Sequence, residues 1–406
     1  MERRVVITGL GIWSCLGTSL DEVRQSLYSG KSGIIFSQAR KDAGFRSALC
    51  ADVPKADLKK YLSRDLRKLM PEEAQYGYLA TIQAMEHAKL DQDFLDQNEV
   101  GVIYGNDSVA EATMTALDMF RQAGSTAACG SGAIFQSMNS TVTMNLATLL
   151  HLRGINLTAS AACASGSHSV GLSYLLIKDG LQDCIICGGA QEANMFSVAS
   201  FDGLMAFSTR EDEPTKASRP FDKDRDGLVP GGGAATLVLE SYEHAVKRGA
   251  PILAEIVGWG FSGNGDHIST PNVAGPTRSL ELCLKNGGIN PRDIGYINAH
   301  ATSTHAGDGR EALAIANIFG DYRVPVTSTK SQTGHEMWMA GASELIYSIL
   351  MMKNDFIGGS LNFENPDEDT ACINVIPETR EAHFDMFLSN SFGFGGTNSS
   401  LIIKNL

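Results

Sequence analysis

A stretch of small residues, INLTASAACASGSHSVG at 155–171, places a cysteine at a sharp turn between a strand and a helix. Residues 155–159 are typical of a short buried strand, and an apolar helical pattern runs from Ala164 to a stop at Gly180. Cys163 is therefore expected at the N-terminus of a buried helix, where free N–H groups and the helix dipole favour a thiolate. The sequence predicts a nucleophile whose pKa is lowered from about 8.5.

Three other segments place reactive side chains after predicted strands. They are NAHATST at 298–304, KSQTGH at 330–335 and NSFGFGGTN at 390–398. Ligand sites of α/β proteins lie beyond the carboxyl ends of strands, so these segments are expected to meet Cys163 there. A thiol beside histidines favours nucleophilic acyl transfer. No metal site is expected, because the candidate ligands share no helix face or short loop.

Strand and helix patterns alternate along the chain and fall into two similar sets. This alternation predicts mainly parallel sheets with helices on both faces. Cys163 follows the third strand of the first set and Lys330 the third strand of the second, so a pseudo-twofold axis would bring them together. Strands are predicted near 4–8, 99–104, 155–159, 182–188 and 235–240, then near 252–257, 294–298, 324–328, 385–390 and 400–404; helices are predicted at 71–88, 109–122, 139–152, 164–179, 276–286, 308–318 and 340–353.

The bulk composition indicates a globular α/β protein. With 406 residues and 43% hydrophobic content the chain can form two packed units, predicted at 1–248 and 249–406. The net charge of −13 argues against nucleic acid or an anionic membrane as a partner. No apolar run reaches the roughly 18–20 residues of a membrane span, and no signal peptide is visible, so a cytoplasmic location is expected.

Two short motifs are interpreted as structural. Cys184 and Cys187 form a CxxC pair inside a buried strand pattern with no second ligand pair after it. Gly9-Leu10-Gly11 lacks the third glycine of a dinucleotide-binding loop. By contrast, Arg64, Arg67 and Lys68 have the spacing of one helical face, which on an acidic protein is either a solvated face or a docking patch for an acidic partner.

The four segments, with VVITGLGI near the start and RPFDKDRDGLVPGGGAATLVLE at 219–240, resemble the β-ketoacyl-acyl-carrier-protein synthases over essentially the whole chain. The resemblance implies a thiolase-like fold, with two similar βαβ-type halves in a layered αβαβα architecture. It implies a 3-oxoacyl-[acyl-carrier-protein] synthase, an acyltransferase that condenses a Cys163-bound acyl chain with malonyl-ACP in type II fatty acid elongation. Expected partners are acyl carrier protein, its thioesters and a second copy of the chain, with a heterodimer in a polyketide-type pathway.

The resemblance also implies roles for individual residues. Cys163 carries the acyl chain, and its backbone N–H forms an oxyanion hole with that of Phe394. His300 and His335 donate from Nε2 to the malonyl thioester oxygen. No cofactor is expected beyond the phosphopantetheine of the carrier, although a monovalent cation site near Asn390 is allowed. Lys330 is paired with Glu344, Asp308 caps a helix, Thr302 and Thr304 hold the pantetheine arm, Phe392 and Phe394 form a gate loop, and Arg64, Arg67 and Lys68 dock the carrier.

The chain departs from the family pattern near the second histidine. The family commonly has xLGAAG after this histidine, where the chain has EMWMAG at 336–341, so Trp338 and Met339 replace very small residues. Ala301 stands in place of Gly and His305 in place of Pro. The length and type of the acyl chain therefore stay open. Alternatives are a dedicated ketosynthase of a type II polyketide or aryl-polyene pathway, a non-catalytic chain-length partner subunit, which Cys163 disfavours, and a thiolase using coenzyme A, which the two histidine motifs disfavour.

Overall fold

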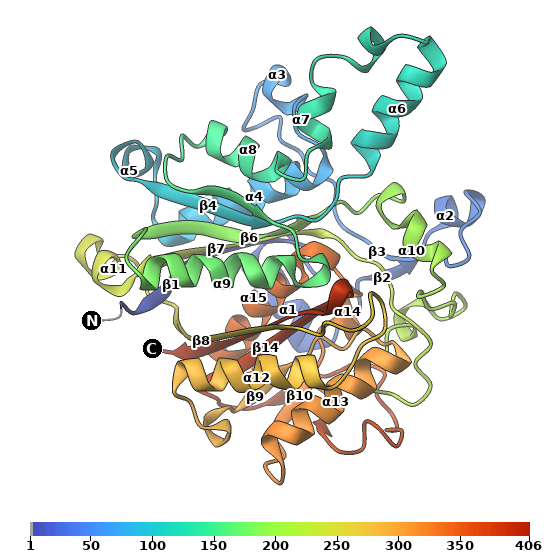
Figure 1. The fold of residues 1–406 in the computed structure, drawn as a ribbon, viewed down its shortest axis with the longest axis vertical. Helices are drawn as coiled ribbons and strands as arrows, with labels where there is room; N and C mark the ends of the chain where they lie inside the picture. The colour runs from blue at the N-terminus through green and yellow to red at the C-terminus, as the bar shows by residue number, and fades with distance from the viewer. Residues whose placement is uncertain (1–2) are drawn as a thin grey trace.

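The computed structural model describes residues 3–406, and its largest feature is an eleven-stranded sheet in two halves (Figure 1). All ten predicted strands are present in it, five in each half. The first half contains β1 (Val5–Trp13), β4 (Val100–Gly105), β5 (Asn156–Ala159), β6 (Cys184–Gln191) and β7 (Gly233–Ser241). The second contains β8 (Ala254–Gly263), β9 (Tyr296–Asn298), β10 (Pro325–Thr327), β14 (Met386–Gly393) and β15 (Thr397–Asn405), with the short β12 (Asn374–Val375) at its edge.

The two halves repeat one topology. The order β1-β7-β6-β4-β5 in the first half matches β8-β15-β14-β9-β10 in the second, with the same parallel and antiparallel pairs. Antiparallel pairing of β1 with β8 joins them. The prediction of mainly parallel sheets holds for four of the five strands in each half, and it is wrong for the last strand of each set, which runs antiparallel to both neighbours. In the second half β14 and β15 are joined by a short turn, and such a connection permits only antiparallel pairing.

Helices form three layers around the two half-sheets, which gives the expected αβαβα architecture (Figure 1). The outer layers are α4 (Glu72–Ala88) with α8 (Thr141–Leu149), and α12 (Ala274–Gly287) with α13 (His305–Phe319). The middle layer consists of α9 (Ser165–Lys178) and α15 (Ala340–Lys353), which pack against each other. All seven predicted helices are found, α6 (Glu111–Ala123) being the seventh.

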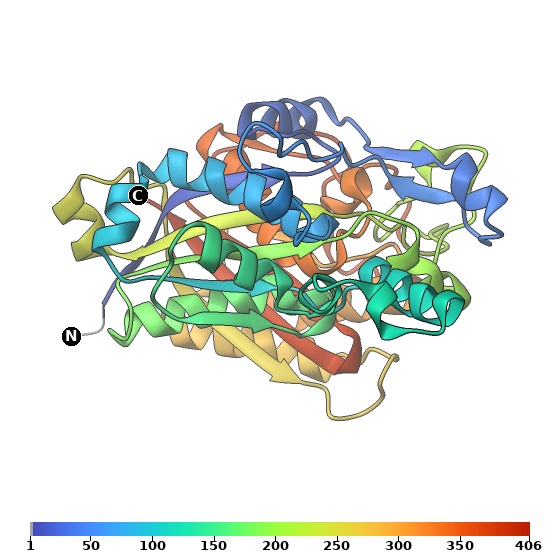
Figure 2. The ribbon, with the colours of Figure 1, turned by 90° about the horizontal axis from the view of Figure 1, so that it is seen from above.

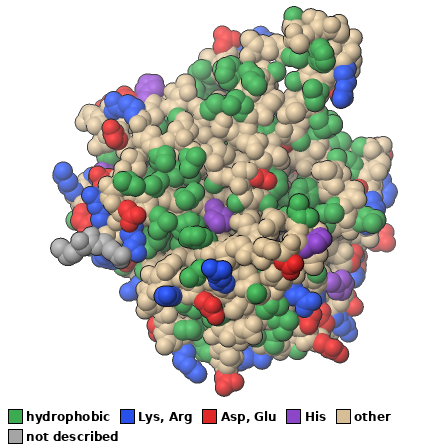
Figure 3. Space-filling model, viewed as in Figure 1, with side chains coloured by type: hydrophobic (Ala, Val, Ile, Leu, Met, Phe, Trp, Pro, Cys, Tyr) green, Lys and Arg blue, Asp and Glu red, His purple; other side chains and the backbone are tan. Residues whose placement is uncertain are grey.

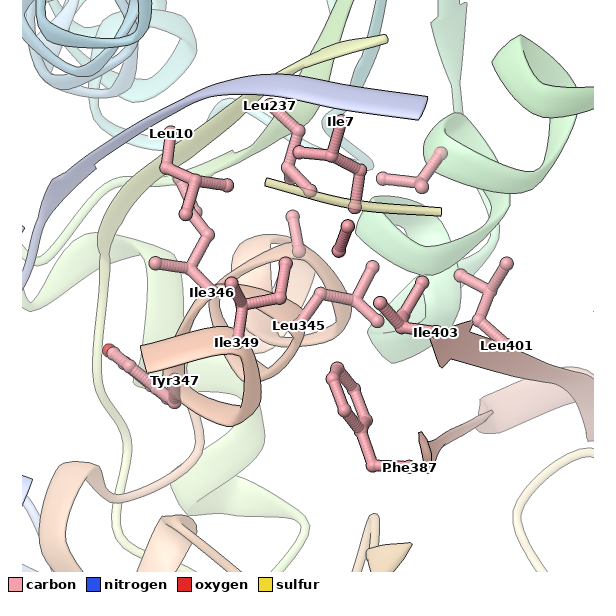
Figure 4. Close-up of a cluster of buried hydrophobic side chains, with 14 of the residues drawn as sticks. Ile7, Leu10, Leu237, Leu345, Ile346, Tyr347, Ile349, Phe387, Leu401 and Ile403 are labelled. Carbon is pink, nitrogen blue, oxygen red and sulfur yellow. The ribbon is translucent and has the colours of Figure 1, made fainter. Parts of the chain in front are cut away.

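The apolar core lies between the two half-sheets, around the middle helices (Figure 4). Ile7 and Leu237 from the first half meet Leu345 of α15 and Leu401 of the second half. The N-termini of α9 and α15 approach so closely that a Cβ on Gly341 would come within 2.6 Å of the Ser167 backbone nitrogen. Glycine at this crossing fixes the segments that precede the two helices against each other.

The remaining elements lie around this core, and α6 and α7 project beyond the sheets (Figure 2). No helix of residues 3–406 is long and apolar enough to cross a membrane. The other elements are α1 (Leu20–Ser29), α2 (Gln38–Asp42), α3 (Arg64–Arg67), α5 (Gln92–Gln97), α7 (Ala133–Ser137), α10 (Ala199–Gly203), α11 (Tyr242–Arg248), α14 (Lys330–Thr333), the pair β2 (Ile34–Phe36) and β3 (Leu49–Ala51), and the pair β11 (Phe356–Ile357) and β13 (Arg380–Glu381).

Candidate active site

The predicted reactive segments meet at the carboxyl ends of the strands. Cys163 lies on the 3₁₀ turn η2 (Ala162–Ala164) between β5 and α9, and His300 follows β9 directly. Lys330 starts α14 after β10, and Phe394 starts η7 (Phe394–Gly396) after β14. One cavity of about 390 Å³ is lined by Cys163, His300, His335, Thr302, Thr304, Phe392 and Phe394, together with apolar side chains.

The turn that carries Cys163 has a strained backbone and is held by hydrogen bonds. Ala162 has φ 46°, a left-handed conformation that is unusual for a residue with a side chain. The Ser165 hydroxyl donates to the Ala162 carbonyl at 2.6 Å and accepts from the Ala161 N–H at 2.8 Å. These two bonds hold the turn, so Cys163 is fixed in a buried position at the tip of α9.

Burial, rather than the helix end, dominates the charge state of Cys163. It raises the pKa of the thiol to about 12, against the opposing effects of the Lys330 ammonium and the Phe394 N–H. The expectation of a lowered pKa is therefore wrong for the protein without substrate, because desolvation of a thiolate outweighs a helix terminus. The thiol is the resting form, and the N–H groups of Cys163 and Phe394 both lower the pKa of its sulfur, so they lie beside it. Their role as an oxyanion hole stays a prediction.

Hydrogen bonds assign the same tautomer to the two histidines. Nδ1 of His335 accepts from the Met337 N–H at 3.2 Å, and Nδ1 of His300 lies 3.5 Å from Nζ of Lys330. The proton of each neutral ring is therefore on Nε2. Burial and the Lys330 charge lower the pKa of both histidines well below 6.5. The rings lie 5.3 Å apart, and Nε2 of His335 has no partner within residues 3–406.

Lys330 is buried and forms the expected ion pair with Glu344. Burial raises the pKa of the Glu344 carboxyl to about 7, and the Lys330 ammonium opposes this shift. Because Lys330 directs its remaining donor towards His300, its charge disfavours protonation of that ring. The pair thus keeps a neutral imidazole beside the nucleophile.

Glu311 is a site residue that the sequence analysis missed. Its buried carboxylate accepts from the backbone N–H of His300 at 2.9 Å, from that of Ala301 at 2.7 Å and from Asn390 at 3.0 Å. One turn earlier on α13, Asp308 accepts from the N–H of Thr302 and of Phe221. Asp308 therefore holds the loop that leads into its helix, and the signal for Glu311 was its spacing three residues after Asp308 on the same face.

The two threonines and the gate loop line the mouth of the cavity. Ser303 has φ 71°, which brings the hydroxyls of Thr302 and Thr304 to 3.1 Å from each other. Phe394 is 36% exposed and stacks on Phe201. Gly395 has φ 77°, and a Cβ there would meet no atom within 4 Å, so this loop has room to change conformation.

The surroundings of Asn390 fit a monovalent cation only in part. Both polar atoms of the Asn390 side chain have a partner, since the amide nitrogen donates to Glu311 and the amide oxygen accepts from Ser400. Beside it, however, are buried oxygens that have no hydrogen-bond partner in the described part of the chain: Oδ1 of Asn298, Oγ of Ser389 and Oε2 of Glu344. Ser389 pairs with Asn298 across β14 and β9, and Asn298 also donates to the Glu344 carbonyl. Oxygen ligands of this kind suit hard cations.

The predicted docking residues lie on the surface at α3. Arg64 and Lys68 are exposed, and both line a shallow depression with Arg67. The helix is only four residues long, so its face is small. Lys55 and Lys59 line the same depression and enlarge the basic patch. They lie outside the helix, so the helical spacing of Arg64, Arg67 and Lys68 gave no sign of them.

The charge state of Cys163 leads to a first prediction. Because thiolate is the reactive form and its fraction grows tenfold per pH unit below the pKa, alkylation of Cys163 by iodoacetamide should still be accelerating at about pH 10. An ordinary thiol levels off above about 8.5. Peptide mass spectrometry would follow the Cys163 peptide, with C163S to identify it. A plateau below about pH 9 would show that the helix end outweighs burial.

Fold and site together define a condensing enzyme of the thiolase-like fold. The pattern described as "Beta-ketoacyl synthase, N-terminal domain" matches residues 2–245, and that described as "Beta-ketoacyl synthase, C-terminal domain" matches residues 253–364. The chain therefore belongs to the β-ketoacyl synthase family.

Relatives match along the full chain. A protein of Haemophilus influenzae named 3-oxoacyl-[acyl-carrier-protein] synthase 1 is 41% identical over 99% of both chains. A solved β-ketoacyl synthase of Burkholderia phymatum is 37% identical, with a TM-score of 0.96 and full coverage of both chains. A type II polyketide ketosynthase solved with its acyl-carrier protein, and described as bound to the hexaketide, is 27% identical, with a TM-score of 0.89 and full coverage of both chains.

Proposed function

We propose that this protein is a 3-oxoacyl-[acyl-carrier-protein] synthase that elongates acyl chains by decarboxylative condensation with malonyl-ACP. The observation that carries the proposal is one cavity lined by a thiol and by two neutral imidazoles whose Nδ1 contacts put the proton on Nε2. The names of the relatives agree with it. The test is incubation of the purified protein with an acyl-ACP and malonyl-ACP, with mass spectrometry of the carrier for a 3-oxoacyl product lengthened by two carbons.

In the first half-reaction Cys163 takes the acyl chain from its carrier. The sulfur attacks the thioester carbonyl, the oxyanion is stabilised by the N–H groups of Cys163 and Phe394, and the thiol proton leaves with the carrier thiol. Since burial raises the pKa of Cys163, the thiolate forms only as this exchange proceeds. The resting thiol and the resulting thioester are both neutral, so neither places a full charge in the buried site.

In the second half-reaction the histidines stabilise an enolate. His300 and His335 donate from Nε2 to the thioester oxygen of malonyl-ACP. When neutral carbon dioxide leaves, these two donors stabilise the negative charge of the enolate on that oxygen. The enolate carbon then attacks the acyl thioester on Cys163, forming the new carbon–carbon bond and releasing the sulfur as a thiolate. This thiolate takes up one proton from solvent and returns to the resting thiol. Lys330, paired with Glu344, keeps both rings neutral and therefore able to donate without a full positive charge in the cavity.

The chain needs no other group for these steps beyond the carrier's phosphopantetheine. Thr302 and Thr304 are proposed to bind this arm at the cavity mouth, and Phe392 with Phe394 to gate it. If a monovalent cation binds, Asn298, Ser389 and Glu344 would hold it and it would supply positive charge behind Lys330. The division into residues 1–248 and 249–406 stays a prediction that the repeated strand order supports, and the cytoplasmic location stays a prediction.

The carrier is proposed to dock on the basic patch at α3. Reversal of two charges in R64E/K68E should raise KM for carrier-bound substrates roughly tenfold or more, because electrostatic attraction speeds association with an acidic carrier. KM for small thioester mimics should not change, since they need no docking surface. K247E/K285E, at exposed lysines on α11 and α12, is the control with the same change in net charge. Equal effects on both substrate types would refute this docking site.

A homodimer is proposed through the free edge of the first half-sheet. β5 ends the strand order and has Leu157 43% exposed. Nearby, α6 and α7 expose apolar side chains on the projecting arm (Figure 3), among them Met114, Leu117, Met119, Phe120, Ile134 and Phe135. An unpaired edge beside an apolar surface of this kind is usually covered by a partner. Analytical ultracentrifugation of the purified chain tests the proposal, and a monomer at micromolar concentration would refute it.

A dedicated ketosynthase of a polyketide or polyene pathway is the second candidate. It is favoured by Trp338 and Met339, two large buried residues next to His335 where the family pattern has very small ones. A non-catalytic partner subunit is disfavoured because Cys163 and both histidines are in place. The two enzyme candidates share one chemistry, so a series of acyl donors, rather than the reaction itself, distinguishes them.

A further inference from the structure

Trp338 is buried behind the lining of the cavity, in the same apolar cluster as the nucleophile. The 3₁₀ turn η6 (Met337–Met339) packs against η2, and the Trp338 side chain is only 5% exposed. Its ring centroid is 6.2 Å from that of Phe201, which lines the cavity. Cys163 and Trp338 belong to one buried apolar cluster, whose other members are Val198, Phe207, Leu228 and Met337.

The backbone beneath Trp338 cannot withdraw from the nucleophile. Its carbonyl oxygen lies so close to two glycines that a Cβ would approach it to 2.9 Å at Gly166 and 2.6 Å at Gly189. Met337 has φ 47°, a conformation that only a tightly packed surrounding maintains in a residue with a side chain. The Met337 N–H also donates to His335. Trp338 and the proposed catalytic residue His335 therefore lie on one tightly packed segment, residues 335–339.

The aromatic rings close the apolar end of the cavity. Phe201 stacks on Phe394 at 6.1 Å and on Phe207 at 6.4 Å, and Trp338 continues this wall. In the described part of the chain, Phe201 and Leu228 line the cavity, whereas Trp338 and Phe207 of the same cluster do not, so the open space stops in front of them. The remaining cavity of about 390 Å³ must hold the pantetheine arm as well as the acyl chain.

We propose that Trp338 is a specificity-determining residue that restricts the acyl chain on Cys163 to short donors. This inference rests on the proposed function and adds its substrate class, short-chain acyl thioesters. A chain bonded to Cys163 extends among the side chains of this cluster, where Phe201 and the indole behind it fill the space. Longer chains would overlap the indole, and a well-packed wall does not yield to added methylenes without cost.

The test measures acylation of Cys163 over a ladder of saturated acyl-ACPs from butanoyl to hexadecanoyl, with intact-protein mass spectrometry as the readout. Wild type should accept the short donors and fail on the long ones. W338L and the milder W338F should each move the limit to longer chains, W338L by more. The rate for the first excluded donor should rise roughly tenfold or more, as expected for relief of even one poorly accommodated methylene.

W259L is the matched control. Trp259 is also buried, but it belongs to the core between the half-sheets and donates to Ser399, so its loss should leave the chain-length limit unchanged. Circular dichroism establishes that each variant folds, and W338F keeps the test open if W338L does not. An unchanged limit in folded W338F or W338L, or wild-type acylation by hexadecanoyl as fast as by butanoyl, would overturn the inference. Malonyl-ACP decarboxylation is measured separately; its absence in wild type would instead contradict the proposed function.

Discussion

The C163A variant should lose elongation while it still decarboxylates malonyl-ACP. Cys163 is the only thiol among the described residues that line the cavity, and a thiol is the group from which an acyl chain transfers most readily to a carbon nucleophile. Removal of a covalent nucleophile should therefore lower the elongation rate by roughly four orders of magnitude or more. The donors that stabilise the malonyl enolate belong to His300 and His335, which the substitution leaves in place. Carbon dioxide release and 3-oxoacyl-ACP formation are the two measurements.

C187A is the appropriate control for this experiment. Cys187 is as buried as Cys163 and lies on β6 in the core, with no place in the cavity lining. It should retain both activities, apart from any loss of stability from the removed sulfur. Loss of decarboxylation in folded C163A would contradict the separation of roles, and persistent elongation would show that another group carries the acyl chain.

Much of the fold was predictable because buried strands and helices contain many apolar residues, and these form patterns that the sequence shows directly. β6, CIICGGAQ, is buried on both faces and was marked by its apolar run. α15 is buried along most of its length and was marked by a mainly apolar helical pattern. The direction of β7 and β15 was not predictable. A strand has the same apolar pattern whether it runs parallel or antiparallel to its neighbour. Its direction depends on the connection before it, such as the turn between β14 and β15, and the apolar pattern does not contain the conformation of that connection.

The site was predictable in its reactive residues but not in their electrostatics. Cys163, His300 and Lys330 were found because each follows a strand. The sign of the Cys163 pKa shift was missed because a helix terminus is local in sequence, whereas desolvation depends on the rings and turns that tertiary packing places around the sulfur. Glu311 was missed for a related reason: its bond to Asn390 joins positions 79 residues apart, and its bonds to the His300 and Ala301 N–H groups depend on the loop that precedes α13.

The H335A variant should lose decarboxylation and keep acylation of Cys163, whereas C163A should lose acylation and keep decarboxylation. Nε2 of His335 is a buried donor with no hydrogen-bond partner within residues 3–406. Its hydrogen bond therefore forms only with the substrate, and it stabilises the enolate oxygen. Loss of one such donor should lower decarboxylation and elongation by roughly 10²–10³-fold. Acylation of Cys163 from an acyl-ACP should persist, because the oxyanion hole for that step consists of backbone N–H groups. Burst acylation and carbon dioxide release measure the two steps independently.

H335Q and H168A complete this experiment. The side-chain amide of Gln keeps an N–H near the position of Nε2, so H335Q should recover part of the decarboxylation that H335A loses, which a merely structural role would not predict. His168 is a partly buried histidine bonded to Thr397 outside the cavity, and H168A should keep both steps. Because burial and Lys330 hold the pKa of His335 well below 6.5, protonation of His335 should not lower decarboxylation by wild type as the pH falls from 8 towards 6.5. The Glu344 carboxyl, whose pKa burial raises to about 7, titrates in this range, so the profile is also measured for E344Q. A fall in rate that follows an ordinary histidine pKa in both proteins would show that the neutral-donor role of His335 is wrong.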